Sequence, residues 1–271
     1  MKNIIVILIL TISPILAQCD WNDDDQVDVL DVVATVDCIM SACWDNIGAT
    51  VTDIDGNVYE TITIGDQIWM AENLKVTHYN NGDPIPLEIS NSDWMNLTTG
   101  AYSVYPWDYD DQSLATCYGD CSEIYGNIYN GPSIADENLE ICPDGFHIPS
   151  DEEWMELEMY LGMSFEESQD YGFRGTDQGS QIAGNFNWWY SSGLLENNPM
   201  FGSSGFLALP GGWRDAVGGY GGMGLSGYFW SPSGTGGNEW RRRISWNDSG
   251  VDRGSAYRPS GFSVRCVGDA D

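Results

Sequence analysis

Oxygen-bearing side chains recur at short intervals between Asp20 and Asp31, with the spacing of a calcium-binding loop. Such a loop takes side-chain oxygens at its first, third and fifth positions. It takes a backbone carbonyl at the seventh, a water-linked group at the ninth and a carboxylate at the twelfth. In this chain those positions are, in order, Asp20, Asn22, Asp24, Gln26, Asp28 and Asp31. We therefore predict that this segment binds one calcium ion as its cofactor.

Apolar residues from Leu30 to Met40 follow the loop at helical spacing, so a short helix is expected directly after it. A loop that leads straight into a helix resembles one repeat of a type I dockerin. Two features depart from that pattern: Asp25 stands where a dockerin has glycine, and no second repeat follows. The resemblance therefore implies a calcium-stabilised segment over residues 18–44, with attachment to a cohesin as an alternative.

The other chemistry-bearing residues form no recognisable catalytic motif. Of the two histidines, His78 lies in a polar stretch and His147 precedes an expected helix. The chain has neither a Gly-x-Ser-x-Gly elbow nor a His-Glu-x-x-His zinc motif. Gly219–Gly224 matches a dinucleotide pattern in letters, but no strand and helix are expected around it. We therefore predict that the protein is not an enzyme; an unrecognised extracellular hydrolase is the alternative.

Aromatic side chains in two loop-like stretches are the candidates for ligand contact, because aromatic rings can stack on other flat or apolar surfaces such as sugar faces. They are Tyr105, Trp107, Tyr109, Trp188, Trp189 and Tyr190. We expect these rings to be exposed and to give weak binding that multivalency at a surface would strengthen.

Net charge narrows the range of partners. The chain has 10 basic and 41 acidic residues, and 10 − 41 gives a formal charge of −31. Such a protein is repelled by nucleic acid and by anionic lipid. The expected partners are therefore calcium and either a glycan or a cell-surface protein, with no nucleic acid.

The first residues have the pattern of an export signal. Lys2 supplies a positive charge, Ile4–Leu10 is an unbroken apolar run, and Pro14–Ala17 resembles a cleavage region. The apolar part is too short to span a bilayer. We expect residues 1–17 to be removed and the mature protein to be secreted or held at the cell surface. Cleavage before Cys19, with a lipid anchor there, is the alternative.

Export would place the cysteines in an oxidising compartment, which favours disulfides over zinc. The seven cysteines are Cys19, Cys38, Cys43, Cys117, Cys121, Cys142 and Cys266. Cys117 and Cys121 are close enough to staple one loop. Cys38 and Cys43 can pair if the helix before them stops near Met40. Cys19 is the candidate for the unpaired thiol.

Residues 50–269 are expected to form one domain. Alternating apolar residues around a two-residue Gly-Asp turn predict a hairpin over residues 58–70. Ser150 and Glu153 form a capping box that begins a helix, and Gly162 ends it. Further elements are expected at residues 178–184, 227–230, 240–244 and 262–267.

A run of three basic residues, Arg241, Arg242 and Arg243, lies inside one of these expected strands. Successive side chains of a strand point to opposite faces. Arg242 is therefore expected to face away from its two neighbours and to pair with nearby acidic side chains.

Five stretches, in this order, carry a family resemblance: residues 51–59, 64–74, 142–154, 227–231 and 261–267, which read VTDIDGNVY, IGDQIWMAENL, CPDGFHIPSDEEW, GYFWS and GFSVRCV. Together they resemble the Fibrobacter succinogenes major paralogous domain family. That family resembles the C-type-lectin-like and formylglycine-generating-enzyme-like superfold. The resemblance implies an α+β domain with long loops and a disulfide between Cys142 and Cys266. It implies export and surface display rather than a reaction.

The sequence thus predicts a C-type-lectin-like α+β domain preceded by a short calcium loop and helix. The expected function is that of a secreted or cell-surface, non-catalytic binding or adhesion module that contacts glycans. An accessory component of polysaccharide degradation, attached to a scaffold through the dockerin-like segment, is the alternative.

Overall fold

The computed structural model describes residues 49–87, 90–106, 120–135, 138–184, 189–190, 193–234 and 236–270. The chain divides into two units, Met1–Gly48 and Ala49–Asp271, and the described residues all belong to the second. The predicted export signal lies outside the described residues. So do the predicted calcium ligands and four of the cysteines: Asp20, Asn22, Asp24, Gln26, Asp28, Asp31, Cys19, Cys38, Cys43 and Cys117.

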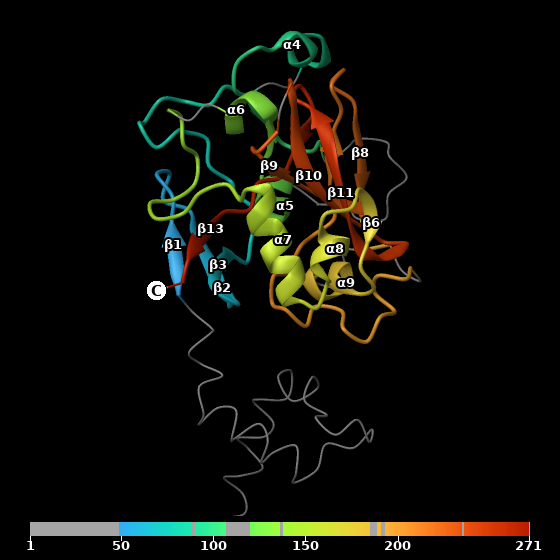
Figure 1. Ribbon diagram of the computed structural model, residues 1–271. Helices are drawn as coiled ribbons and strands as arrows, with labels where there is room; N and C mark the ends of the chain where they lie inside the picture. The colour runs from blue at the N-terminus through green and yellow to red at the C-terminus, as the bar shows by residue number, and fades with distance from the viewer. Residues whose placement is uncertain are drawn as a thin grey trace, which may run out of the picture. The chain divides into compact units, whose positions relative to one another are not determined.

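Two β-sheets and several short helices make up the second unit, so the expected mixture of strands and helices is confirmed (Figure 1). The smaller sheet has four antiparallel strands. In spatial order they are β1 (Thr50–Thr52), β2 (Val58–Ile64), β3 (Gln67–Met70) and β13 (Val267–Asp269). The first three strands and the last one therefore meet in the same sheet.

The larger sheet contains nine strands. Along its main path they are β4 (Tyr102–Ser103), β5 (Ile128–Asn130), β12 (Gly261–Phe262), β7 (Gly211–Arg214), β9 (Ser226–Ser231), β10 (Asn238–Ser245), β11 (Asp248–Tyr257) and β6 (Gly172–Arg174). β8 (Tyr220–Met223) lies off this path and pairs with β7. The pairing of β7 with β9 is parallel, and the other pairings are antiparallel.

Six described helices connect or cover these strands. They are α4 (Asn91–Asn96), α5 (Cys121–Tyr125), α6 (Gly131–Ala135), α7 (Asp151–Tyr160), α8 (Phe165–Ser168) and α9 (Gln178–Ile182). No helix in the described part of the chain is both long enough and apolar enough to cross a membrane.

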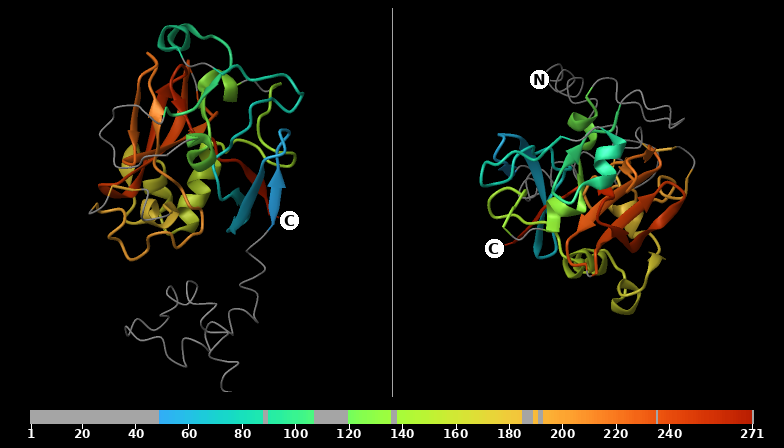
Figure 2. Two further views of the ribbon diagram at one scale, coloured as in Figure 1. Left: turned by 180° about the vertical axis from the view of Figure 1, so that it is seen from behind. Right: turned by 90° about the horizontal axis from the view of Figure 1, so that it is seen from above.

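Helix α7 lies between the two sheets (Figures 1 and 2). Its start is the predicted capping box: the Ser150 side chain accepts from the Glu153 backbone N–H, and the Glu153 side chain accepts from the Ser150 backbone N–H. The ring of Trp154 is fully buried, 4.9 Å from the ring of Trp69 on β3 and 5.8 Å from that of Phe229 on β9. The apolar side of α7 thus joins the sheets into one core.

The predicted strand over residues 262–267 is wrong as a single element, because it is divided into β12 and β13, which belong to different sheets. Arg265 lies in the crossing segment and is fully buried. Its guanidinium donates to Asn73 Oδ1 at 2.7 Å and to the carbonyl of Phe206. Burial lowers the pKa of Arg265 to about 9. These contacts hold the crossing segment out of strand geometry, and local alternation does not reveal them.

The disulfide between Cys142 and Cys266 is present, as the family resemblance implied. The two half-cystines are buried and 124 residues apart in sequence. His147, shortly after Cys142, pairs with Val267, shortly after Cys266, in an isolated β-bridge. The segment that leads into α7 is therefore tied covalently and by backbone hydrogen bonds to the last strand.

A pH-dependent contact stabilises the start of α7. His147 Nε2 lies 2.5 Å from Glu153 Oε1. The hydrogen bond to Glu153 raises the pKa of His147. Burial alone would raise the pKa of Glu153, but hydrogen bonds from His147 and Ser150 outweigh it and the pKa is lowered.

We expect His147→Gln to lower the melting temperature more at about pH 5.5 than at about pH 8.5. A histidine whose pKa is raised on folding stabilises the protein at pH values below its pKa in the unfolded chain. This stabilisation is lost as the pH rises through its pKa in the folded protein. A glutamate whose pKa is lowered on folding stabilises the protein at pH values above its pKa in the unfolded chain. This stabilisation is lost as the pH falls through its pKa in the folded protein. The pair therefore contributes most between the ordinary values of 4.5 and 6.5. Thermal melts of both proteins across pH check this, and equal decreases at both pH values would contradict it.

Candidate functional site

Five side chains lie in one register row across the larger sheet. Arg243 on β10 is opposite Tyr228 on β9 and opposite Asp252 on β11, and Asp252 is opposite Phe173 on β6. Gly212 pairs with Gly227, so Trp213 on β7 is the neighbour of Tyr228. Residues in register on neighbouring strands point to the same face of a sheet. We call Trp213, Tyr228, Arg243, Asp252 and Phe173 the outward row.

The opposite face of the same strands is buried against α7. Arg242 is fully buried, and its guanidinium donates to Asp151 Oδ1 at 2.6 Å and to Glu158 Oε1 at 2.7 Å. Arg253 donates to both oxygens of Asp151. The expectation that Arg242 faces away from its neighbours and pairs with acids is confirmed. Because alternate residues point to opposite faces, the outward row lies on the side away from α7.

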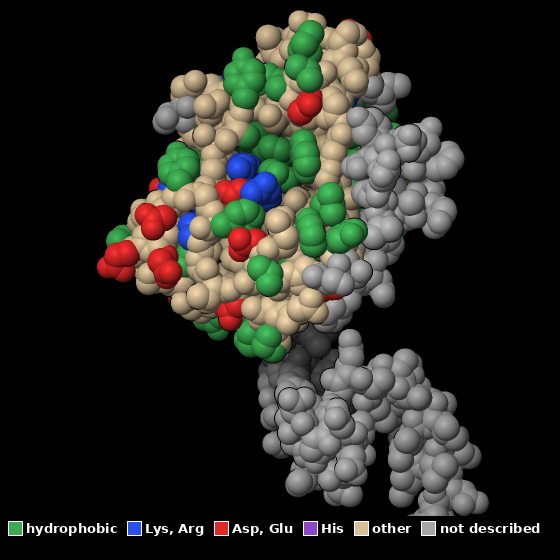
Figure 3. Space-filling view, turned by 90° about the vertical axis from the view of Figure 1, so that its right-hand side faces the viewer, with side chains coloured by type: hydrophobic (Ala, Val, Ile, Leu, Met, Phe, Trp, Pro, Cys, Tyr) green, Lys and Arg blue, Asp and Glu red, His purple; other side chains and the backbone are tan. Residues whose placement is uncertain are grey.

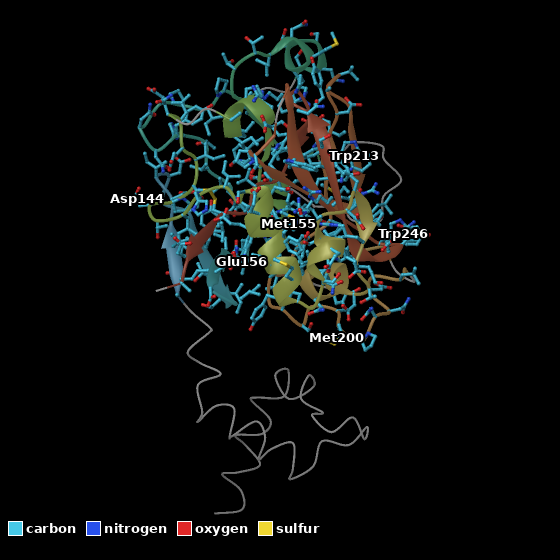
Figure 4. The ribbon with its side chains drawn as sticks, viewed as in Figure 1. Asp144, Met155, Glu156, Met200, Trp213 and Trp246 are labelled. Atoms are coloured by element: carbon cyan, nitrogen blue, oxygen red, sulfur yellow. A yellow bond between two sulfur atoms is a disulfide. The ribbon has the colours of Figure 1, made fainter. Side chains whose placement is uncertain are left out.

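Figure 3 shows this side of the molecule, with basic side chains grouped in the middle among hydrophobic side chains and carboxylates. In Figure 4, Trp213 lies beside β8 and Glu156 lies on α7. The side chains of the outward row range from buried to about one-third exposed. Phe173 is 36% exposed, the side chain of Arg243 is 30% exposed, and Asp252 is 5% exposed.

Two guanidinium groups share one carboxylate oxygen in the middle of the row. Arg241 Nη1 and Arg243 Nε each lie 2.9 Å from Asp252 Oδ2. Arg243 Nη1 also donates to the Tyr228 hydroxyl at 3.3 Å. A guanidinium carries five N–H donors, more than these contacts use. The centre of the row therefore presents N–H donors and a carboxylate at fixed positions, with a local charge of +2 − 1 = +1.

Aromatic rings flank this polar centre on both sides. The guanidinium of Arg243 lies 4.7 Å from the ring centre of Phe173 and 5.8 Å from that of Tyr228, and the guanidinium of Arg241 lies 5.3 Å from that of Tyr228. The Tyr228 ring is in turn 5.2 Å from the ring of Trp213. Cation–π and ring–ring contacts hold the side chains of the row in place.

The Trp213 ring packs against two glycines of β8, Gly221 and Gly222. A Cβ atom added to Gly222 would lie 1.7 Å from the Trp213 ring, and one added to Gly221 would lie 2.9 Å from it. The indole therefore lies directly on the backbone of β8, which residues with side chains would prevent. This close approach explains Gly219–Gly224 as a structural strand with its adjoining turns.

A comparison with protein families supports the relationship suggested by the sequence. The model of the Fibrobacter succinogenes major domain matches residues 62–268, which is more than half of the chain. The chain belongs to this family. No curated protein and no solved structure matches the chain significantly. The matched region of the Fibrobacter succinogenes major domain runs from within β2 to within β13 and includes the whole outward row.

Three of the predicted ligand-contacting aromatics of this Fibrobacter succinogenes major domain lie in the described residues, and two of them are buried. Tyr105 is 4% exposed and packs 5.2 Å from the Tyr220 ring. Trp189 is also 4% exposed, and its Nε1 donates to the Gly184 carbonyl. The prediction that these two rings are exposed is wrong, because Tyr105 and Trp189 themselves pack into the hydrophobic core. Tyr190 is 38% exposed and contacts the Trp246 ring edge-on at 4.7 Å.

Other predicted site residues lie outside the described residues: Trp107, Tyr109, Trp188 and Cys117. Cys121 is buried and disulfide-bonded, and the Cys117–Cys121 pairing stays a prediction. Within the described ranges, no group of three or more His, Cys, Asp or Glu side chains is placed to hold a metal ion. Calcium binding by the preceding segment likewise stays a prediction.

Loop position did not reveal Trp213, Tyr228 and Phe173, which lie on strands. Strand alternation carried part of the signal, because Tyr228 and Arg243 both occupy outward positions in predicted strands. The register that joins β6, β7, β9, β10 and β11 was needed to bring the five side chains into one row.

Proposed function

We propose that this protein is an exported, non-catalytic binding module that holds polysaccharide on the outward row. The observation that carries the proposal is the order of side chains in that row. Aromatic rings stand at Trp213, Tyr228 and Phe173, and the Arg243–Asp252 pair stands between Tyr228 and Phe173. A sugar ring has apolar C–H faces and a polar hydroxyl rim, so it requires both kinds of contact.

The length of the row favours a polymer over a small molecule. Trp213 and Phe173 lie four strands apart in the sheet, which corresponds to about 19 Å. That distance is enough for several units of an extended chain. Rings held by neighbouring side chains lose little conformational freedom when a ligand binds, which reduces the cost of association.

Several features support export and the lectin-like architecture. The Cys142–Cys266 disulfide suits an oxidising compartment, as does the leader pattern of residues 1–17. The first and last strands of the domain share a sheet, and the disulfide ties the lead into α7 to the last strand. We propose on these grounds the C-type-lectin-like superfold, and secretion or surface display.

Replacing Trp213 by alanine is expected to weaken polysaccharide binding by about tenfold, because a stacking ring is removed. Affinity electrophoresis in gels containing hydroxyethylcellulose, xylan, mannan or polygalacturonate measures this. Phe165→Ala is the matched control, since Phe165 is an exposed ring on α8, outside the row. Melting temperatures show whether each variant is folded.

If the folded Trp213→Ala and Phe165→Ala proteins are retarded equally by polysaccharide, the outward row is not the binding site. Failure of the wild-type protein to bind any polysaccharide would instead favour adhesion to a cell-surface protein. Turnover of a polysaccharide, ester or peptide that disappears on changing one carboxylate or histidine would favour the hydrolase alternative.

The N-terminal segment is proposed to bind one calcium ion, and its dockerin-like pattern leaves attachment to a scaffold as the second candidate role. Titration calorimetry on residues 18–271 is expected to give a dissociation constant of about 10⁻⁴–10⁻³ M. The Asp20→Ala, Asp31→Ala double variant should abolish the heat, because the first and last ligands are removed. Unchanged binding in that variant would contradict the ligand assignment.

A further inference from the structure

The middle of the outward row is a charge cluster in which the negative member is the least exposed. Asp252 is 5% exposed, whereas the side chains of Arg241 and Arg243 are 17% and 30% exposed. Both guanidinium groups approach the same oxygen, Asp252 Oδ2. The carboxylate therefore occupies the position that a ligand carboxylate or sulfate would take between the two arginines.

The glycine opposite Arg241 strengthens this arrangement. Gly254 pairs with Arg241 across β10 and β11, and a Cβ atom added to Gly254 would lie 2.9 Å from Arg241 Nη2. The guanidinium of Arg241 thus lies against the backbone of β11, on the side of Asp252. Arg243 is held in turn by the rings of Phe173 and Tyr228. Neither arginine has to move for the pair to keep Asp252 between them.

Resting on the proposed function, we propose that the outward row recognises uncharged, hydroxyl-rich polysaccharide, and that Asp252 is the residue that discriminates against anionic polysaccharide. The N–H donors of Arg241 and Arg243 that Asp252 does not use donate to sugar hydroxyls, and the flanking rings stack on sugar faces. An anionic ligand gains less than it would from two free arginines, because both guanidinium groups already share Asp252 Oδ2 and the carboxylate lowers the charge of the cluster from +2 to +1. Surface charges beyond about 8 Å are screened at physiological salt, so this local cluster decides the preference.

The test compares retardation of the full mature chain by hydroxyethylcellulose, which is uncharged, and by polygalacturonate, which is anionic. The wild-type protein should bind the first and not the second. Asp252→Asn keeps the side-chain size but frees two positive charges, and it should gain polygalacturonate binding by at least about tenfold. Glu156→Gln is the matched control with the same change of charge, on exposed α7 surface away from the row (Figure 4). It should bind like the wild type.

A second variant and a salt series keep the outcome independent of one substitution. Adding Arg243→Gln to Asp252→Asn should abolish the gained polygalacturonate binding. Wild-type retardation by hydroxyethylcellulose should change by less than about twofold between low and high salt, because the ligand is uncharged. The salt series needs no variant, so it tests the preference for uncharged chains even if Asp252→Asn does not fold.

The results separate this proposal from the proposed function. If the wild-type protein binds neither of these polymers and none of the other polysaccharides named above, the proposed function is overturned. Wild-type binding to hydroxyethylcellulose, with a folded Asp252→Asn protein that still ignores polygalacturonate, would overturn the role of Asp252 alone. Stronger wild-type binding to polygalacturonate, or loss of hydroxyethylcellulose binding at high salt, would overturn the preference for uncharged chains.

Discussion

Asp151→Asn is expected to lower the free energy of unfolding by about 3–5 kcal/mol, because it removes one charge from a buried, hydrogen-bonded ionic network. Asp151 is 3% exposed, and its carboxylate accepts hydrogen bonds from Arg242 and Arg253. The substitution leaves these two guanidinium groups with a neutral partner. Urea denaturation of wild type and variant at neutral pH measures the difference.

The rest of the network explains why the loss is large. Glu158 lies two helical turns after Asp151 and binds Arg242 and Arg174. The described cluster already contains three arginines and two carboxylates, a net charge of +3 − 2 = +1. Neutralising Asp151 raises that buried charge to +2, and burial of unpaired charge is costly.

Glu152→Gln is the matched control, because Glu152 is the next residue, is exposed and lies in the same first turn of α7. It should cost less than about 1 kcal/mol through the helix dipole. Equal losses for the two variants would show that the helix dipole, and not the buried network, determines the effect.

The same network predicts sensitivity to acid. Burial alone would raise the pKa of Asp151, but hydrogen bonds and charge from Arg253 and Arg242 outweigh it and the pKa is lowered. Because its pKa is lowered on folding, the Asp151 carboxylate stabilises the protein at pH values above 3.8, the ordinary pKa of an aspartate. This stability is lost as the pH falls through the pKa of Asp151 in the folded protein. The stability difference between wild type and Asp151→Asn should therefore shrink in strong acid.

Local sequence signals predicted the parts of the fold that local interactions determine. The capping box at Ser150 and the hairpin over residues 58–70 depend on neighbours in the chain, and both are present. The alternation of Arg241, Arg242 and Arg243 also depends on a single strand, and it correctly placed Arg242 on the face opposite to its two neighbours, paired with acidic side chains.

Features that depend on distant contacts could not be predicted in this way. Tyr105 and Trp189 resembled exposed loop residues, but burial is decided by what packs over them. The break at Arg265 depends on Asn73 and Phe206, which are far away in sequence. The outward row depends on the register of five strands, of which β6, β7 and β11 were not expected. The candidate site was therefore less predictable than the fold that carries it.

The Cys142→Ser, Cys266→Ser double variant is expected to lose about 5 kcal/mol of unfolding free energy in the chain-entropy model. The reason is the separation of 124 residues between the two half-cystines, since a longer loop restricts the unfolded chain more. Urea denaturation under non-reducing conditions measures the loss. The Cys117→Ser, Cys121→Ser variant is the control, and its predicted short loop should cost about 2 kcal/mol in the same model.

Ligand binding by the folded double variant separates two effects of this disulfide. If the disulfide only restricts the unfolded chain, the folded double variant keeps the native arrangement of the two sheets. Its outward row then binds polysaccharide as tightly as that of the wild type. The hydrogen bonds of Arg265 and the β-bridge between His147 and Val267 favour this result, because they hold the crossing segment and the last strand without the disulfide. Weaker binding by a folded double variant would show instead that the disulfide positions the two sheets in the native state. Equal losses of stability for the long-loop and short-loop variants would contradict the entropic origin itself.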